Sequence, residues 1–277
     1  MQPVVIIGLM IVAAGLFLLI RGLIEPYLLE NSEQDLAFPG EEGRPALTVT
    51  LFSDLHAGLC KVSDDKLIRA LFSSPCDALL FGGDVCNDGR DNAAGLLRLA
   101  KIASRAAELH IPCYAVRGNH DTSVSRDDFL AAGFTLLENE NVKLAGQTGL
   151  PFLLLGLDDS GRHRTRVWPT VSDAFLDEFP VSRRIALVHN SDYIFSGNAD
   201  KYHFQLSGHS HGGQIYMPFG LEFRLFRKDR LALEGIHRGS FYKYGICGYI
   251  SRGCGCVVIP IRLFSKPQIT HITFLSR

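Results

Sequence analysis

The sequence of 277 residues lacks a surplus of either charge, since 28 Lys and Arg stand against 29 Asp and Glu. Proteins that bind nucleic acids usually carry a basic surface, so this balance gives no reason to expect such a partner. A disulfide framework is also disfavoured, because the seven cysteines are odd in number and scattered. We therefore expect reduced thiols in a domain that faces the cytosol. Internal repeats and low-complexity tracts are absent from the sequence as well.

Charged residues are missing from the start of the chain, where Pro3 to Ile20 is uncharged and the apolar run resumes after Arg21. A helix needs about 20 apolar residues to cross a bilayer, so residues 1–24 are predicted to form a single transmembrane anchor. A cleaved signal peptide would have basic residues before the apolar stretch and small residues after it, and neither is present. Arg21 lies on the carboxyl side of the anchor, which by the positive-inside rule predicts a cytoplasmic domain.

The rest of the chain is predicted to comprise a linker and one large domain. Residues 25–44 are acidic and turn-rich, which is typical of a linker, and residues 45–277 are numerous enough for one full core. Apolar spacing predicts helices over 64–73 and 92–109. Strands are predicted at 47–52, 78–81, 114–116, 152–157, 185–188, 204–206, 215–217, 248–251 and 269–274. This order favours an α/β domain built as a sandwich of two sheets.

Five segments contain side chains that commonly bind metals, and most of them directly follow a short apolar run. Buried strands carry polar residues at their carboxyl ends, which is where open α/β sheets bind ligands. Ionisable groups buried at five such places would be very costly without a cation to neutralise them. We therefore predict a metal site. The segments are Ser53-Asp54-Leu55-His56, Gly82-Gly83-Asp84, Gly118-Asn119-His120-Asp121, Val188-His189-Asn190 and Gly208-His209-Ser210-His211-Gly212-Gly213-Gln214.

Mixed imidazole, carboxylate and amide ligands suit Mn²⁺, Fe or Zn²⁺ better than Ca²⁺. Asp84 is the candidate bridging carboxylate, because two preceding glycines let the backbone approach closely. Two cations about 3.5–4 Å apart can clamp a phosphorus centre and bind a hydroxide nucleophile. His120 is then expected to be the general acid, held by Asp121. Taken singly, these residues also have structural interpretations: Asp54 could be a helix N-cap, and the segment around Asn119 a turn.

The ordered set D-x-H, G-G-D, G-N-H-D, H-N and G-H-S-H-G-G-Q resembles the calcineurin-like metallophosphoesterases. Within them it is similar to a membrane-anchored bacterial branch that also carries the Ser251-Arg252-Gly253 segment. The resemblance covers about Thr48 to the C-terminus and implies a two-sheet αββα sandwich. Val85-Cys86 and Ser210 depart from the commonest pattern without touching a ligand. One ion would be bound by Asp54, His56, Asp84 and His211, and the other by Asp84, Asn119, His189 and His209, with His120 as the acid.

The resemblance implies a hydrolase that attacks a phosphoester or pyrophosphate bond with a metal-bound hydroxide. Mn²⁺ is the preferred ion, and Fe and Zn²⁺ are alternatives. The preferred substrate is membrane-associated, such as UDP-2,3-diacylglucosamine in lipid A synthesis, cleaved by a single-pass protein of the bacterial inner membrane. A phosphodiesterase or phosphomonoesterase acting on soluble substrates, and a non-catalytic metal-stabilised scaffold, are the alternatives. The oligomeric state is left open.

Two basic segments are candidates to bind the substrate. Arg162 and Arg164 lie close to Trp168 in the sequence, and Arg224 and Arg227 alternate with apolar residues from Phe219 onward. The second segment could form a lid that contacts lipid headgroups or an acyl chain. The alternative is a solvated hairpin with packed aromatic side chains.

Overall fold

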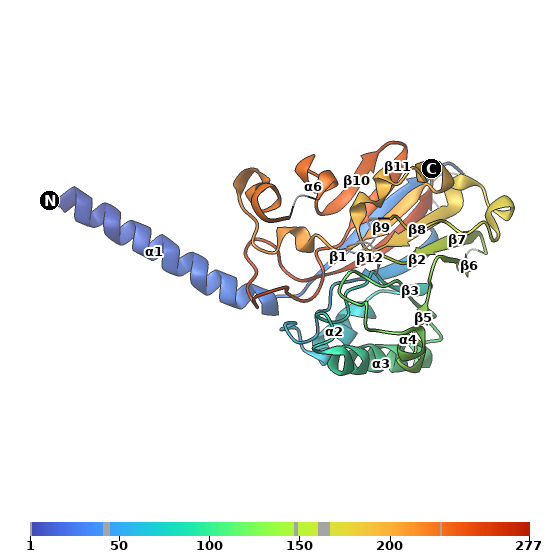
Figure 1. Ribbon diagram of the computed structural model, residues 1–277, viewed down its shortest axis with the longest axis horizontal. Helices are drawn as coiled ribbons and strands as arrows, with labels where there is room; N and C mark the ends of the chain where they lie inside the picture. The colour runs from blue at the N-terminus through green and yellow to red at the C-terminus, as the bar shows by residue number, and fades with distance from the viewer. Residues whose placement is uncertain (1, 41–44, 147–148, 160–166, 228) are drawn as a thin grey trace.

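The computed structural model describes residues 2–40, 45–146, 149–159, 167–227 and 229–277. Two six-stranded sheets form the centre of the fold (Figure 1). The first sheet contains, in spatial order, β1 (Glu30–Phe38), β12 (Gln268–Ser276), β2 (Pro45–Phe52), β3 (Ala78–Phe81), β4 (Cys113–Ala115) and β5 (Thr135–Leu136). The second contains β10 (Gly239–Lys243), β11 (Ile246–Ile250), β9 (Phe204–Ser207), β8 (Arg184–Val188), β7 (Pro151–Leu157) and β6 (Glu140–Ala145).

Three apolar clusters hold these layers together. The largest rings between the sheets include Phe152, Phe204 and Phe274, which come from β7, β9 and β12. Three helices cover the outer face of the first sheet: α2 (Asp64–Leu71), α3 (Asn92–Glu108) and α4 (Arg126–Ala131). The outer face of the second sheet is covered by shorter pieces, among them the 3-10 turn Ser191–Phe195 and α6 (Arg230–Leu233). The predicted two-sheet sandwich is therefore confirmed.

The N-terminal helix α1 (Gln2–Ile24) projects from one end of this sandwich (Figure 1). Within the span Pro3–Tyr27, the most apolar stretch of 18 residues has a mean hydropathy of 2.9 and is not buried against the domain. By length and composition α1 can cross a membrane. Its last turn contacts the domain, since the Gly22 carbonyl accepts a hydrogen bond from the backbone N–H of Arg262 at 3.1 Å.

The prediction that residues 25–44 form a linker is wrong over most of its length. Glu25–Tyr27 form a 3-10 turn, and Glu30–Phe38 form β1, which pairs in parallel with β12 from Gln268 to Ser276. The side chains of β1 alternate between exposed and partly buried positions, as expected for a strand at the edge of a sheet. The folded domain therefore begins before residue 45.

Two smaller expectations also differ from the structure. Residues 215–217 form no strand, and only an isolated bridge joins Ile215 to Leu263. The described residues between Phe219 and Arg230 do not form the hairpin that was the alternative to a lid. They form the 3-10 turn Pro218–Gly220, the π-helical turn Phe223–Arg227 and the start of α6.

Candidate metal centre

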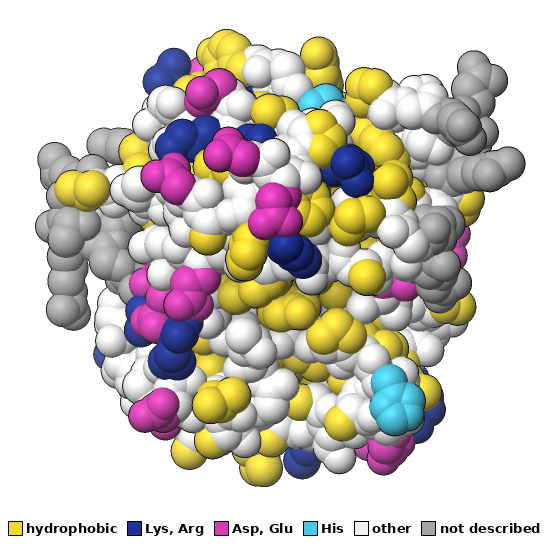
Figure 2. Space-filling model, turned by 90° about the vertical axis from the view of Figure 1, so that its right-hand side faces the viewer, with side chains coloured by type: hydrophobic (Ala, Val, Ile, Leu, Met, Phe, Trp, Pro, Cys, Tyr) yellow, Lys and Arg dark blue, Asp and Glu magenta, His cyan; other side chains and the backbone are white. Residues whose placement is uncertain are grey.

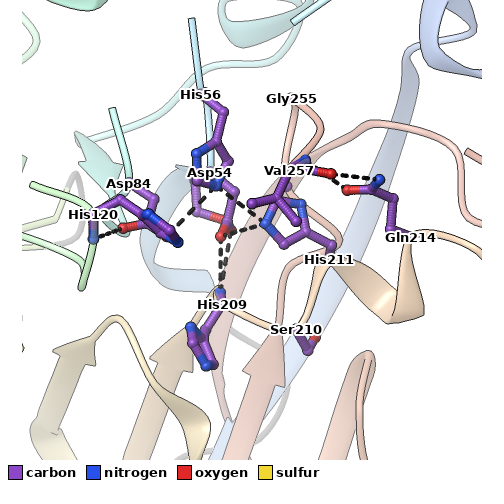
Figure 3. A network of polar contacts seen from close by, with 12 residues as sticks. Asp54, His56, Asp84, His120, His209, Ser210, His211, Gln214, Gly255 and Val257 are labelled. Atoms are coloured by element: carbon purple, nitrogen blue, oxygen red, sulfur yellow. Dashed lines mark hydrogen bonds and ion pairs between the residues drawn. The ribbon is translucent and has the colours of Figure 1, made fainter. Parts of the chain in front are cut away.

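The candidate ligands lie just beyond the carboxyl ends of the central strands in both sheets. In the first sheet β2 leads to Asp54 and His56, and β3 leads to Asp84. These strands run parallel to each other and to β4, which leads to Asn119. In the second sheet the parallel strands β8 and β9 lead to His189 and to the pair His209 and His211. Parallel strands end at the same edge, so five separate segments converge there, and Figure 3 labels residues from four of them.

The ligand atoms form two groups of three, within each of which all atoms lie within 4.8 Å of one another. Asp54, His56 and His211 make the first group, and Asp84, His189 and His209 make the second. Asp84 belongs geometrically to both: its Oδ2 lies 3.0 Å from His189 Nε2 and 3.5 Å from His56 Nε2. The geometry therefore agrees with the predicted bridging carboxylate.

The imidazole rings are oriented as metal ligands require. His56 Nδ1 lies 3.1 Å from the Cys86 carbonyl and His189 Nδ1 lies 2.7 Å from the Gly82 carbonyl. Each Nδ1–H can donate to its carbonyl, which leaves the Nε2 lone pair pointing into the site. His56 Nε2 faces His211 Nε2 at 3.2 Å, and His189 Nε2 faces His209 Nδ1 at 3.2 Å. Two nitrogens that bind the same ion, each at about 2.1 Å, lie about this far apart from each other. Each of the two pairs therefore fits a single shared cation.

The protonation states agree with this fit. Burial lowers the pKa of His56 and His211, and the neighbouring positive charges contribute for His211. Burial likewise lowers the pKa of His209 to about 4. Burial opposes protonation of His189 too, but the Asp84 carboxylate outweighs it and raises the pKa of His189 to about 10. Three neutral rings can therefore act as ligands directly, while His189, paired with the Asp84 carboxylate, carries a proton that a metal ion would displace.

Asn119 offers a further donor atom. Its side-chain Oδ1 is buried and has no hydrogen-bond partner among the residues that the structure describes. A buried carbonyl oxygen without a partner is costly, and a cation would satisfy it. The residue borders the same cleft as Asp84, His209 and His211. The predicted role of Asn119 thus fits its surroundings.

The backbone at this edge is strained. Asp54, Asp84, His209 and His211 all have positive φ angles, between 51° and 67°. Such conformations cost about 1–3 kcal/mol each and persist where the surrounding structure enforces them, often at functional sites. Gly118 shows why small residues surround the ligands, because a Cβ atom there would lie 2.2 Å from Asp84 Oδ1. Strained backbone therefore carries four of the candidate ligands.

The prediction that Asp121 orients His120 is wrong. The Asp121 carboxylate instead accepts hydrogen bonds from the backbone N–H groups of Asp84 and Gly118, at 2.7 and 3.0 Å, and so fixes the loops that carry ligands. His120 Nδ1 lies 2.9 Å from Asp88 Oδ1. Asp88 follows the Gly-Gly-Asp segment by four residues and belongs to none of the motifs, so sequence reasoning missed it. His120 itself borders the cleft, and its partner is Asp88.

Asp229 is a second residue that the sequence did not single out. Its Oδ1 lies 3.3 Å from His209 Nε2, on the side of the ring opposite the site. Arg227 Nε contacts the other oxygen, Oδ2, at 3.0 Å. Although burial alone would raise it, these two partners hold the pKa of Asp229 below its usual range. A carboxylate behind a ligand histidine fixes its tautomer and orientation, so Asp229 supports His209 in this way.

Arg262 supports the first group from behind. It is fully buried, and its guanidinium donates to the carbonyls of Gly255, Ser265 and Arg252 at 3.0, 2.8 and 2.8 Å. Its Nη2 also lies 3.4 Å from His211 Nδ1. The arginine therefore holds three backbone carbonyls of the C-terminal loop close to the ring of His211, a candidate ligand.

The site opens into a cleft of about 400 Å³, bordered by ligands on one side and by Phe226, Arg227, Val257 and Val258 on the other. Of the predicted substrate-binding residues, Arg227 reaches this cleft, but it also donates to the His209 carbonyl at 2.6 Å. Arg224 is exposed and does not border the cleft. Arg162 and Arg164 lie outside the described residues.

Comparisons with known proteins agree with this geometry. The family model described as calcineurin-like phosphoesterase matches residues 47–213, a span that includes every candidate ligand. Metallophosphoesterase YkoQ of Bacillus subtilis is 29% identical over 240 residues, 83% of this chain and 84% of that protein. Phosphodiesterase YaeI of Escherichia coli is 27% identical over 258 residues, 90% of this chain and 89% of that protein. A transmembrane protein with a metallophosphoesterase domain from Bos taurus is 27% identical, covering 82% of this chain and 52% of its own length.

Two stacked sheets with paired groups of metal-binding side chains define a metal-dependent phosphoester hydrolase. More narrowly, the chain belongs to the calcineurin-like metallophosphoesterase family. The predicted family and the predicted enzyme class are confirmed. The relatives include a transmembrane protein, which together with α1 is in keeping with a membrane anchor.

Proposed function

We propose that this protein is a phosphohydrolase with two divalent metal ions that cleaves a phosphoester or pyrophosphate bond. The observation that supports this most directly is the pair of buried ligand groups joined by Asp84 Oδ2. When bound, the ions supply Lewis acidity at phosphorus and a nucleophile at neutral pH. A non-catalytic scaffold would not need an open cleft beside the ligands, which this chain has.

In this proposal each side chain has a defined task. One ion is held by Asp54, His56, Asp84 and His211, and the other by Asp84, Asn119, His189 and His209. Imidazole, carboxylate and amide donors suit Mn²⁺ best in our proposal, with Fe and Zn²⁺ as alternatives. All of these side chains are at least nine-tenths buried except that of His209, which is 11% exposed. Their burial keeps water away from the donor atoms and strengthens their attraction for a cation.

His120 is proposed to donate a proton to the leaving group. Asp88 accepts from Nδ1, so the opposite nitrogen, Nε2, is free to act in the cleft that His120 borders. Arg227 is proposed to hold the Asp229–His209 pair in place and to add positive charge where an anionic phosphate arrives.

We further propose a substrate associated with the membrane, with UDP-2,3-diacylglucosamine of lipid A synthesis as the preferred example. The apolar helix α1 supports this, because it would keep the domain beside a bilayer. Arg21 at its carboxyl end favours a cytoplasmic domain at the bacterial inner membrane. Soluble phosphodiesters or phosphomonoesters are the alternative.

The test is an assay of the purified full-length protein, supplied with Mn²⁺, on three classes of substrate. UDP-linked lipids, bis-p-nitrophenyl phosphate and p-nitrophenyl phosphate distinguish pyrophosphate, diester and monoester cleavage. The proposal would be supported if the unmodified protein hydrolyses at least one class of substrate and the Asp84→Ala variant does not. No hydrolysis of any class by the metal-loaded, folded protein would contradict it.

A further inference from the structure

Exposed apolar side chains lie at the mouth of the metal cleft and on the segments that carry the residues of its border. We define this mouth surface by Phe219, Leu225, Phe226, Val258 and Phe264. Phe226 and Val258 border the cleft itself, yet 73% of the Phe226 and 85% of the Val258 area is exposed. Leu225, in the same π-helical turn as Phe226, is 61% exposed, and Phe219, in the preceding 3-10 turn, is 86% exposed. Large apolar groups gathered at one place and left open to water indicate an interaction surface.

The mouth surface continues to the base of α1. The loop that carries Val258 is fixed to the metal rim at one end, where Gln214 Nε2 donates to the carbonyls of Val257 and Ile259 at 3.0 and 3.2 Å. Its other end contacts α1, since the guanidinium of Arg21 lies 4.5 Å above the ring of Phe264. One short loop therefore links the cleft to the point where the apolar helix leaves the domain.

This link sets the position of a bilayer relative to the cleft. If α1 crosses a membrane, the end of the domain from which it projects must face the lipid surface (Figure 1). The segment with α6 lies at that end (Figure 1), as does Phe264, whose ring contacts Arg21 of α1. The opposite end carries acidic and basic side chains side by side among apolar ones (Figure 2). The exposed aromatic and aliphatic side chains of the mouth surface are thus on the side that meets the membrane.

We propose that the mouth surface docks onto the bilayer, so that the metal cleft opens at the lipid–water interface. The occupant is a phospholipid bilayer, and a phosphate-bearing amphiphile could then enter the cleft between Phe226 and Val258 without leaving the interface. Aromatic and aliphatic side chains are stable at the boundary of headgroups and acyl chains. Arg224 is exposed amid these side chains and forms no ion pair with any described residue, so it can meet anionic headgroups.

The inference takes the cleft to be the catalytic one, as proposed above, but its test does not depend on catalysis. The full-length protein is placed in nanodiscs of phosphatidylcholine and phosphatidylglycerol, with either ordinary or brominated acyl chains. Three variants introduce an indole probe: Phe226→Trp, Val258→Trp and the matched control Leu130→Trp. Leu130 is 64% exposed on α4, in the helical layer over the first sheet. The native Trp168 contributes the same background to every sample.

Docking predicts that bromine quenches the introduced indoles at positions 226 and 258 by roughly two-fold, since interfacial side chains lie about 5–10 Å into the boundary. The control at Leu130 should be unaffected. Absence of quenching at either mouth position would overturn the inference. So would a blue-shifted emission there that brominated lipid leaves unchanged, because that result indicates coverage by protein. Hydrolysis of bis-p-nitrophenyl phosphate by the same samples tests the proposed function separately, and matching thermal unfolding curves show that the variants are folded.

Discussion

Removing Asp229 should weaken the binding of one metal ion and leave the other nearly unaffected. The carboxylate contacts His209 Nε2 at 3.3 Å and Arg227 Nε at 3.0 Å, and its side chain is only 13% exposed. Asp229→Ala therefore frees the ring of His209 and also leaves the positive charge of Arg227 uncompensated beside the second ligand group. Loss of a carboxylate behind a ligand histidine typically costs about 10–100-fold in metal affinity. We expect the upper end, about 100-fold or roughly 2.8 kcal/mol, because both effects act together.

Asp229→Asn separates these two effects, because it removes the charge but keeps an oxygen that can accept from His209. We expect a loss of roughly 10-fold in that variant. Asp65→Ala is the matched control, since Asp65 is an exposed carboxylate on α2. Mn²⁺ affinity is measured on metal-free protein by competition with a fluorescent chelator, and stoichiometry by elemental analysis. The role assigned to Asp229 would be refuted if Asp229→Ala and Asp65→Ala bound both metal ions with the same affinity.

Four further substitutions test other parts of the account. Asp84→Ala should abolish hydrolysis and lower the content of both ions, because Oδ2 lies between the two groups; turnover that survives in this variant would rule out a bridging role. His120→Ala should retain the metals but slow cleavage of alkyl esters by roughly 10²–10⁴-fold and of p-nitrophenyl esters far less. Asp88→Asn should show the same dependence on the leaving group with a smaller loss, and equal losses on both esters would count against an acid role for His120. Arg262→Met leaves two buried carbonyls and a partly buried one without their donor, so it should cost about 3 kcal/mol and lower the Tm by roughly 6–10 °C. An unchanged Tm, with the exposed Arg105→Met as control, would show that these hydrogen bonds add little.

The parts of the fold with a strong local pattern were predictable from the sequence. The strand at 78–81 is a continuous apolar run and forms β3 over the same residues, and the helix predicted at 92–109 is α3. The candidate ligands were predictable too, because each stands in a short motif directly after a strand. Their convergence follows from the parallel order of the strands.

The elements that were missed depend on contacts between distant parts of the chain. The residues of β1 are mostly polar, so they show little apolar pattern, and the strand forms because β12, more than 200 positions later, offers its edge. Asp88 and Asp229 belong to no motif, and their roles depend on the turns that bring them to His120 and His209. Arg262 is a single arginine near the C-terminus, and only the folded loop shows that it lies behind His211.

The central claim is that two metal ions, held by the two ligand groups around Asp84, are required for hydrolysis. Elemental analysis of the active, full-length protein, combined with its activity before and after chelation, tests this most directly. The account predicts two bound divalent ions per chain, loss of bis-p-nitrophenyl phosphate hydrolysis on removal of the ions, and recovery when Mn²⁺ is added back. Full activity in protein that contains no transition metal, unchanged by the chelator, would contradict it.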